Sequence, residues 1–543
     1  MGGRHSVSIE ALDTPAVSHK AFGGAMEGAE RTSRETFSWA PSIISPDQRI
    51  NRVKEMADAR GQDMVQNDGY ATGAINTHKD NIVGAEYRLN AQPDWAVLGV
   101  DQEAAEAFQI QAESEFNLLA DSPECYFDAE GTKTVTGLIR LAVGGFIPTG
   151  EVLATVEWKR AGDRPFSTAI QLVSPTRLSN PDGLPDDQFL SRGVYKDVFG
   201  EPVAYSIRAT FPTDFFDPRV FQWKKIDARK PWGRRQVIHI IEPMQPGQTR
   251  GVADMVSVLK NMRMTKKFKD VVLQNAVVNA SYAAAIESEL PREVVMGSMG
   301  LGQTGFGDVL GTYMNALAAY AGASQNIAVD GVKMPHLFPG TKLALKPMGT
   351  PGGVGTDFEE SLLRHTASAL GLSYEQFSRD YSKTNYSSAR ASMAETWKYM
   401  QSRKKAVADR MATMIYILWL EERINAGAFK MFSRQQAQSF FYDPLKRAAL
   451  TKCSWIGASR GQIDEMKETQ SAILRIKAGL STFEMECARL GEDFRRIFLQ
   501  RAKEDKLMKK LGISFDDGAE KPGANDRQQT LRSSKREEED DEL

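Results

Sequence analysis

Two short glycine-containing strings have spacings that serve chemistry in other proteins, and the first suggests nucleotide binding. The string "GLGQTG" (300–305) fits G-x-G-x-x-G, in which glycines let a pyrophosphate approach a helix N-terminus. The pattern is informative only directly after a strand within a βαβ unit. Here the preceding "MGSMG" is typical of a loop, and no βαβ alternation follows. We interpret the string as a flexible glycine loop.

The second string, "GASRG" (457–461), has the spacing of a hydrolase nucleophile elbow with Ser459 as the nucleophile. Such hydrolases place their residues in the order Ser, acid, His. The last of the six histidines is His365, so no histidine follows Ser459. The string is better interpreted as a loop before a helix that starts near Gln462.

Metal and phosphate chemistry find no support in the sequence. No G-x-x-x-x-G-K-[ST] motif occurs, so a P-loop motor is not expected. His78, His239 and His336 each lack the i, i+4 histidine or nearby cysteine that a metal site needs, and satisfied core or surface histidines are the simpler interpretation. Among 70 acidic residues no catalytic pair stands out. We expect no enzyme, no metal and no cofactor.

Composition and charge describe an ordinary globular chain. Of 543 residues, 41% are hydrophobic and 25% charged, and the formal net charge is -2, so the whole chain is not a polycation built to grip nucleic acid. Three widely spaced cysteines argue against a disulfide framework. The longest apolar run, "MATMIYILWL" (411–420), is too short to span a bilayer, and a soluble protein is expected.

The hydrophobic patterns predict an α+β fold. Helical periodicity marks 49–74 and 103–119, and β-rich runs follow at 149–158, 169–178 and 235–243. Later helices are predicted at 252–286, 358–371 and 462–510. No internal repeat is present.

One combination of elements asks for a functional explanation. The short polar stretch 378–388, "SRDYSKTNYSS", leads into a helix that continues to about Asn425. Small residues near the start of this helix permit close approach of a neighbour, and its apolar second half (411–420) suits a core. A helix of about forty residues reaches roughly 60 Å, which suggests a radial strut in an assembly.

A basic stripe is the second feature left over. In "KNMRMTKKFKD" (260–270), Lys260, Arg263 and Lys267 share one helix face by their i, i+3, i+7 spacing. A solvated face explains such a stripe without any function.

Long ordered motifs resemble the portal proteins of lambda-like tailed bacteriophages. The resemblance extends from about Phe37 to Lys506. The motifs that carry it are "NDGYATGAINTHKDNIVGAEYRL" (67–89), "FPTDFF" with "IHIIEPMQPGQTRGVADMVSVLKNM" (from 211 to 262), "ASYAAAIESEL" (280–290), "KMPHLFPG" (333–340), "SLLRHTASALGLSYEQFSRDYSKTNYSSARASMAETW" (361–397), "CSWIGASRGQIDEMKE" (453–468) and "IKAGLSTFEMECARLGEDF" (476–494).

The resemblance implies a portal fold assembled as a ring, usually of twelve copies, around a channel at one capsid vertex. It divides the chain into named parts: wing (41–250), first stem helix (251–287), clip (288–354), second stem helix (355–377), tunnel loop (378–388), long wing helix with further wing (389–455) and crown (456–510). Outside it lie an N-terminal arm (1–40), expected to be mobile, and an acidic tail (511–543), expected to be disordered because few apolar residues could offset its ordering entropy.

The implied partners are other copies of the chain, double-stranded DNA recognised without sequence preference, the terminase large subunit, a head–tail adaptor or connector, and capsid or scaffold proteins, with no membrane. The implied location is the virion, after assembly in the cytoplasm of the bacterial host. The clip would dock the packaging motor and later the tail connector.

The loop residues follow from this placement. One loop per subunit would form a circle around the axis, where every charge is multiplied by the ring's order. Because 378–388 carries a formal charge of only +1, we expect weak DNA contacts from Arg379, Lys383 and Asn385. Tyr381 and Tyr386 are expected to pack against the neighbouring loop, since duplex bases are not exposed.

The stripe of Lys260, Arg263 and Lys267 would then face either the channel or an adjacent subunit's carboxylates, and the sequence leaves both open. Two other functional classes also remain: another virion component (a head–tail adaptor or capsid subunit) and a DNA-packaging enzyme. Length argues against an adaptor, the long helix argues against a shell protein, and the missing motifs argue against an enzyme.

Overall fold

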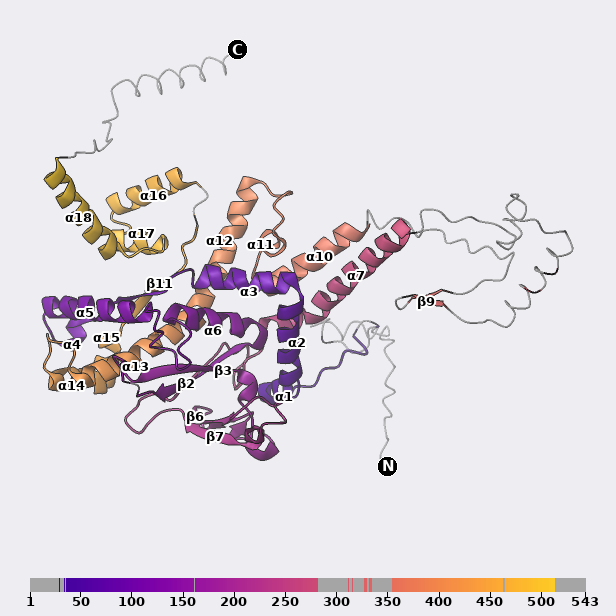
Figure 1. Ribbon diagram of the computed structural model, residues 1–543, viewed down its shortest axis with the longest axis horizontal. Coiled ribbons are helices and arrows are strands. Elements are labelled where there is room, and N and C mark those ends of the chain that lie inside the picture. The colour runs from indigo at the N-terminus through magenta and orange to yellow at the C-terminus, as the bar shows by residue number, and fades with distance from the viewer. Residues whose placement is uncertain are drawn as a thin grey trace, which may run out of the picture.

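The computed structural model describes residues 36–281 and 354–512 except 161, 462 and 463, the short strands 327–329 and 332–334, and the single residues 29, 34, 311 and 315. The predicted arm, clip and tail therefore lie almost wholly outside the described residues. Figure 1 shows a broad body of helices and strands, with one helix pair leaving it sideways and a group of helices standing above it.

In the first half of the chain, the predicted helical range 49–74 overlaps three separate helices and the range 103–119 lies within a fourth, whereas two further helices were not predicted. In chain order the helices are α1 (Pro46–Asn51), α2 (Lys54–Asn67), α3 (Gly69–Ile82), α4 (Trp95–Leu98), α5 (Gln102–Ala120) and α6 (Val135–Thr149). The sequence analysis did not predict α6, whose three glycines and internal Pro148 are poor helix formers; 11 of its 15 residues are buried, so packing stabilises it.

Three antiparallel strands form the central sheet of the body. These are β2 (Glu151–Trp158), β3 (Thr168–Val173) and β8 (Val237–Ile241), in the order β3-β2-β8; β2 and β8 lie inside predicted β-rich runs, and β3 starts one residue before its run. A second sheet, not predicted, has the order β4-β5-β6-β7 and joins β4 (Leu190–Ser191), β5 (Val194–Lys196), β6 (Pro202–Arg208) and β7 (Trp223–Asp227). The fold class, α+β, is confirmed.

A strand pair joins an early and a late segment of the chain within the body. β1 (Arg88–Ala91) pairs antiparallel with β11 (Cys453–Ile456), so residues from both predicted wing segments share one small sheet. One buried core runs through both segments as well, with Phe116 packed against Tyr416, Trp419 and Trp455. The ranges 41–250 and 389–455 are therefore one folded unit.

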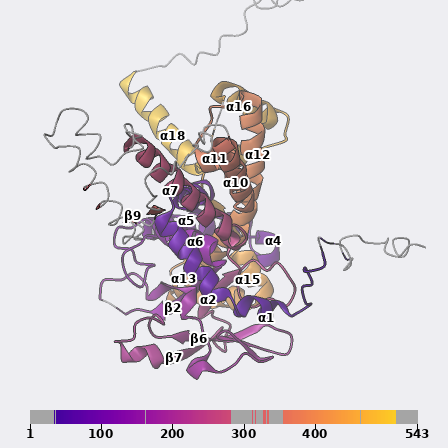
Figure 2. The ribbon, with the colours of Figure 1, turned by 90° about the vertical axis from the view of Figure 1, so that its right-hand side faces the viewer.

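The sideways pair consists of α7 (Leu259–Ser281) and α10 (Val354–Ala369), which lie side by side (Figures 1 and 2). An ion pair of 2.7 Å between Lys269 and Glu359 joins them, and the rings of Phe268 and Phe358 meet edge to face. Two predicted boundaries were wrong. A 3₁₀ turn at Asp254–Ser257 precedes α7, and the second helix ends at Ala369, before Gly371 adopts a left-handed conformation. The short helix α11 (Tyr374–Ser378) then follows.

The predicted long helix is present as three continuous segments of 18, 6 and 17 residues: α12 (Tyr386–Arg403), a π-helical turn (Lys404–Asp409) and α13 (Arg410–Ala426). Its second half is the buried one, as expected. At the π turn, buried Lys404 donates to Asp409 and to the backbone oxygen of Trp455, and the Tyr87 hydroxyl also bonds to Asp409. This polar group fixes the middle of the helix against the β1–β11 pair.

The remaining helices complete the body and the group above it. α14 (Arg434–Tyr442) packs beside α13, and α15 (Pro444–Leu450) packs against α14 and α4, whereas α16 (Glu465–Lys477), α17 (Phe483–Arg489) and α18 (Phe494–Leu511) stand above the body. The predicted start near Gln462 was three residues early, since Asp464 caps α16. In the described part of the chain, no helix is long and apolar enough to cross a membrane.

A buried charge cluster joins the base of α7 to the central sheet. Glu151, on β2, has no solvent exposure and accepts from Arg250 (2.6 Å), Lys54 (3.1 Å) and His239 (3.0 Å). Arg250 also donates to the backbone oxygens of three other residues. Since Arg250 directly precedes the segment leading into α7, the cluster fixes where that helix leaves the body.

Candidate functional site

The predicted loop is real, exposed and shorter than expected. The helix starts at Tyr386, so the loop proper is 379–385. Arg379 ends α11 in a left-handed conformation with φ of +60°. Residues 379–383 and 385 are all exposed. In both views the loop lies at the upper end of α12, on the same side of the body as α16 and α18 (Figures 1 and 2).

Local hydrogen bonds give the loop its shape. The Ser378 hydroxyl donates to the backbone oxygen of Tyr374 at 2.8 Å and accepts from the amide of Asp380 at 3.2 Å. Asp380 in turn accepts from the amide of Ser382 at 2.9 Å. Such serine and aspartate turns replace the backbone bonds that a helix would supply.

Asn385 was predicted to contact DNA, and the structure shows that it is the N-cap of α12. Its side-chain oxygen accepts from the amide of Ser388 and the hydroxyl of Ser387, both at 2.9 Å. An N-cap satisfies an amide that has no partner within the helix. The oxygen of Asn385 is therefore committed to the fold.

Removing this cap should loosen the start of α12. The change Asn385→Ala is expected to cost about 1 kcal/mol, because the amide of Ser388 loses its acceptor. Amide hydrogen exchange in the first turn should then be about fivefold faster. Asn385→Ser keeps an acceptor and serves as the control; equal exchange rates in both variants would contradict the capping role.

Two contacts anchor the loop to the body. Phe377 is buried and stacks on Tyr70 with ring centres 5.5 Å apart, and the Arg379 guanidinium donates to the hydroxyl of Thr77 at 3.0 Å. Burial opposes ionisation of Glu375, but hydrogen bonds from its own amide and from nearby hydroxyls outweigh it and lower its pKa. These contacts fix the residues at the start of the loop against α3.

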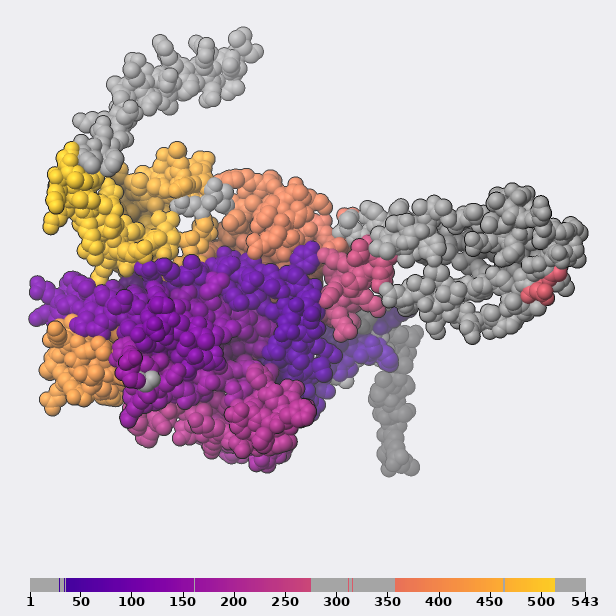
Figure 3. Space-filling view, viewed as in Figure 1, coloured from indigo at the N-terminus to yellow at the C-terminus, as the bar shows by residue number. Residues whose placement is uncertain are grey.

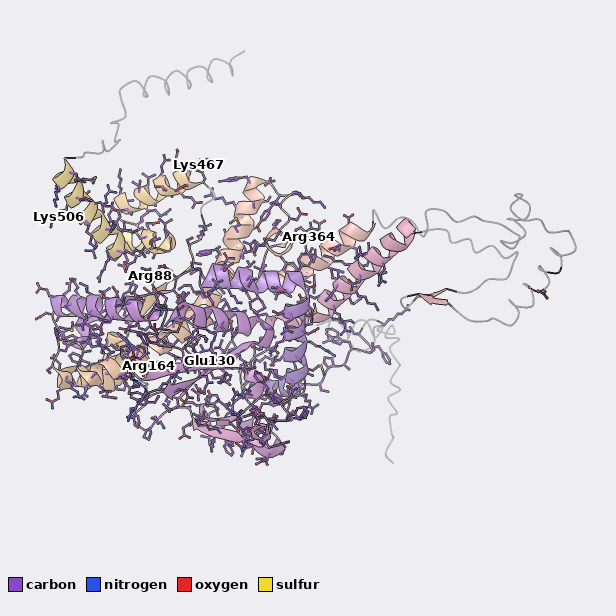
Figure 4. The ribbon with its side chains drawn as sticks, in the orientation of Figure 1. Arg88, Glu130, Arg164, Arg364, Lys467 and Lys506 are labelled. Atoms are coloured by element: carbon purple, nitrogen blue, oxygen red, sulfur yellow. The ribbon has the colours of Figure 1, made fainter. Side chains whose placement is uncertain are left out.

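The charges of the loop are balanced within the subunit. Lys383 forms a 3.0 Å ion pair with Glu360 on α10, and the hydrogen bond to Glu360 raises the pKa of Lys383. Glu360 also pairs with Arg364 at 2.7 Å, and Figure 4 labels Arg364 beside the loop. With Asp380 and Glu360 set against Arg379, Lys383 and Arg364, the loop and its α10 partners carry a net formal charge of only +1.

Tyr381 and Tyr386 face solvent, with 49% and 54% of each residue exposed. Within the described residues neither ring stacks on another aromatic ring. The expectation that they pack against a neighbouring loop stays a prediction.

The basic helix face divides into two groups. Lys266 donates to the backbone oxygen of Asn67 at 2.7 Å, and Lys269 lies 4.2 Å from the ring centre of Tyr70. The three predicted stripe residues are all exposed and form no ion pair with any described residue: Lys260, Arg263 and Lys267. The stripe is therefore available to another molecule, and its orientation in an assembly stays open.

The histidines and the glycine string that were weighed as chemical sites can now be compared with the structure. His78 is buried and bonds to the backbone oxygen of Leu370 at 2.9 Å, and burial lowers its pKa to about 4. His239 bonds to Glu151, so it is a satisfied core histidine as expected, whereas the Nδ1 of His78 is buried without a hydrogen-bond partner. His336 and "GLGQTG" (300–305) lie outside the described residues. Among the described residues no three His, Cys, Asp or Glu side chains form a metal-binding group.

Comparisons with known proteins agree with the motif resemblance. The model of the family "Phage portal protein, lambda family" matches residues 32–404. The chain is 36% identical to Portal protein B of Escherichia phage lambda, over 91% of both proteins. It is 37% identical to the portal protein of Escherichia phage N15, over 91% of this chain and 90% of that one.

Among solved structures, a chain in the neck of a native gene transfer agent particle aligns over 84% of this chain and 97% of that one, at 10% identity and a TM-score of 0.38, which is a weak likeness of fold. The match to the family model is much stronger evidence than this structural likeness, because it covers well over half of the chain and includes the start of α12. The chain therefore belongs to the lambda family of phage portal proteins.

Proposed function

We propose that copies of this chain close side by side into a ring, usually of twelve, and that loops 379–385 line the narrowest part of its channel. Double-stranded DNA passes through this ring during packaging and ejection. The observation that carries the proposal is the exposed, charge-balanced loop at the end of a helix that crosses the whole body.

Exposed apolar side chains support association of many copies. The helices α16 and α18 bury none of their residues fully in the single chain. Large apolar residues there, such as Leu474, Phe498 and Leu499, are exposed. Exposed large apolar side chains on one group of helices favour contacts with other proteins, so we assign the range 456–510 to the crown, where it meets neighbouring subunits.

The charge balance explains why DNA could slide. Phosphate contacts give sequence-independent affinity that grows steeply with their number. A circle of unpaired lysines would hold the duplex, whereas Lys383 is paired with Glu360, which Arg364 shares, so each loop keeps only a small net charge. The loop therefore limits the width of the channel without binding the DNA tightly.

The other parts follow the family assignment. The pair α7 and α10 forms the stem, and the range 288–354 between them forms the clip that docks the terminase large subunit and later the head–tail adaptor. Capsid or scaffold proteins surround the ring at one vertex of the virion, which assembles in the host cytoplasm. No step of this proposal requires catalysis, a metal or a cofactor.

Deleting 379–385 and joining the ends with a short glycine-serine link tests the role of the loop. Electron micrographs should still show rings with a central hole, because the deleted residues bury little surface. The yield of heads that retain full-length DNA should fall. A matched control removes the exposed loop residues 198–199 of the body. Normal DNA retention in the loop variant would refute the proposed role, and a chain that stays monomeric would refute the ring.

A further inference from the structure

The helix α18 carries a basic stripe that has no partner within the described residues. Its sequence holds seven Arg and Lys residues against two acidic ones. Four of the cations share one face by their i, i+7, i+10, i+14 spacing, and all four are exposed: Arg496, Lys503, Lys506 and Lys510. This set, the α18 stripe, extends over about 21 Å.

The stripe differs from the other charged surfaces of the same helix group. On the neighbouring helices, Glu486 is paired with Arg475 at 2.9 Å and with Arg489 at 2.7 Å, and the hydrogen bond from Arg475 is the main cause that lowers its pKa to about 2. Arg495 pairs with Glu113. No described carboxylate forms such a pair with any member of the α18 stripe.

In the single chain the stripe, whose face also holds Leu499, is open to solution. Figure 3 shows α18 at the rim of the molecule, and Figure 4 labels Lys506 on it, at the outer edge of the helix group. The two acidic residues of α18, Glu504 and Asp505, lie off the stripe, and Gln500 donates to Glu504 at 2.8 Å. A polyanion could therefore lie along the helix without meeting a carboxylate.

The chain itself supplies a polyanion of matching charge. After Gly512 the sequence contains ten acidic and five basic residues, and six consecutive carboxylates stand at 537–542, "EEEDDE". Only 24 residues separate this run from Gly512. The composition of this linker predicts a random coil, and for 24 residues such a coil has an end-to-end distance of roughly 25–30 Å, which is enough to turn back along the stripe.

We propose that residues 537–542 bind the α18 stripe of their own chain and compete there with nucleic acid phosphate. A short tether gives a local concentration in the millimolar range, so even a weak electrostatic contact is occupied. The acidic run then acts as a built-in competitor that lowers non-specific binding of DNA to the free protein. This inference does not depend on the role of loop 379–385.

Zero-length cross-linking of amines to carboxylates in the full-length protein tests the contact directly. We expect cross-linked peptides that join Lys503, Lys506 or Lys510 to the run 537–542. They should disappear at about 1 M salt, where the screening length falls to ~3 Å. Cross-links from 537–542 to other lysines only, such as Lys260 or Lys267, would overturn the proposal.

Binding of a short mixed-sequence DNA duplex gives the second readout. A variant with 537–542 changed to Gln and Asn should bind this duplex more tightly. Its affinity should also fall more steeply with salt, by about 0.9 in the log–log slope for each additional phosphate that the protein neutralises. Adding Lys503→Glu, Lys506→Glu and Lys510→Glu should abolish the tighter binding, whereas Arg501→Glu, on another face of α18, should not. Unchanged DNA binding after neutralisation of 537–542, or tighter binding that survives the triple substitution, would refute the competition.

Discussion

Adding two positive charges to each loop, by Asp380→Asn with Ser382→Lys, will make the assembled ring hold duplex DNA. Asparagine keeps the acceptor for the amide of Ser382, and the Ser382 side chain is exposed, so the loop should keep its shape. If six to ten of the new lysines reach phosphates, affinity should fall by about 10³–10⁵ between 50 and 200 mM salt. The unaltered ring, with balanced loops, should show little salt dependence.

Titration of the purified ring with duplex DNA at several salt concentrations measures this effect. Glu130→Lys adds the same charge to an exposed site on the body (Figure 4) and should leave the slope close to that of the unaltered ring. Heads made with the loop variant should also eject their DNA more slowly. Equal salt slopes for the two variants would show that 379–385 does not face the DNA.

Neutralising Glu151 should destabilise the subunit more than any surface change. Glu151→Gln leaves Arg250 buried without its carboxylate, and Lys54 keeps only the carboxylate of Asp58, at 2.8 Å. Removing one partner of a buried ion pair costs about 3–5 kcal/mol, because the remaining charge stays desolvated. Denaturant unfolding at fixed protein concentration measures the loss.

A surface pair provides the matched control for Glu151. Glu55 bonds to Arg192 at 2.5 Å but its side chain is 71% exposed, so Glu55→Gln should cost less than about 1 kcal/mol. If Glu151→Gln and Glu55→Gln lowered the free energy of unfolding by similar amounts, the buried cluster at the base of α7 would contribute no more to stability than a surface ion pair.

Glu151 should also make the folded subunit less stable at acid pH. Burial opposes ionisation of Glu151, but the charges of Arg250 and Lys54 outweigh it and hold its pKa well below the usual value. The unfolded chain therefore binds a proton at higher pH than the folded one. The stabilisation is complete above about pH 4.3, the ordinary value for glutamate, and is lost as the pH falls below it. In Glu151→Gln this part of the acid sensitivity should be absent.

Local sequence patterns determined much of this protein. Alternating and β-branched residues predicted β2, β3 and β8 near their observed positions. Helical period and the apolar run 411–420 predicted the long helix and its buried half. The small formal charge of 378–388 and the long ordered motifs led to the loop and to the portal family before any contact was known. These signals are local, because a few neighbouring residues set backbone preference and burial.

The tertiary structure alone decided which charges meet. Lys383 is neutralised by Glu360, 23 residues away, and Glu151 by Arg250, 99 residues away. β1 pairs with β11 across more than 360 residues, and the π turn forms where Lys404 and Asp409 meet Tyr87 and Trp455. The attraction within such a pair depends on how close the two charges lie in the fold and on how well water is excluded from them. Neither property can be read from a run of neighbouring residues. The sequence therefore predicted a loop of low charge, and the fold supplied the carboxylate that balances it.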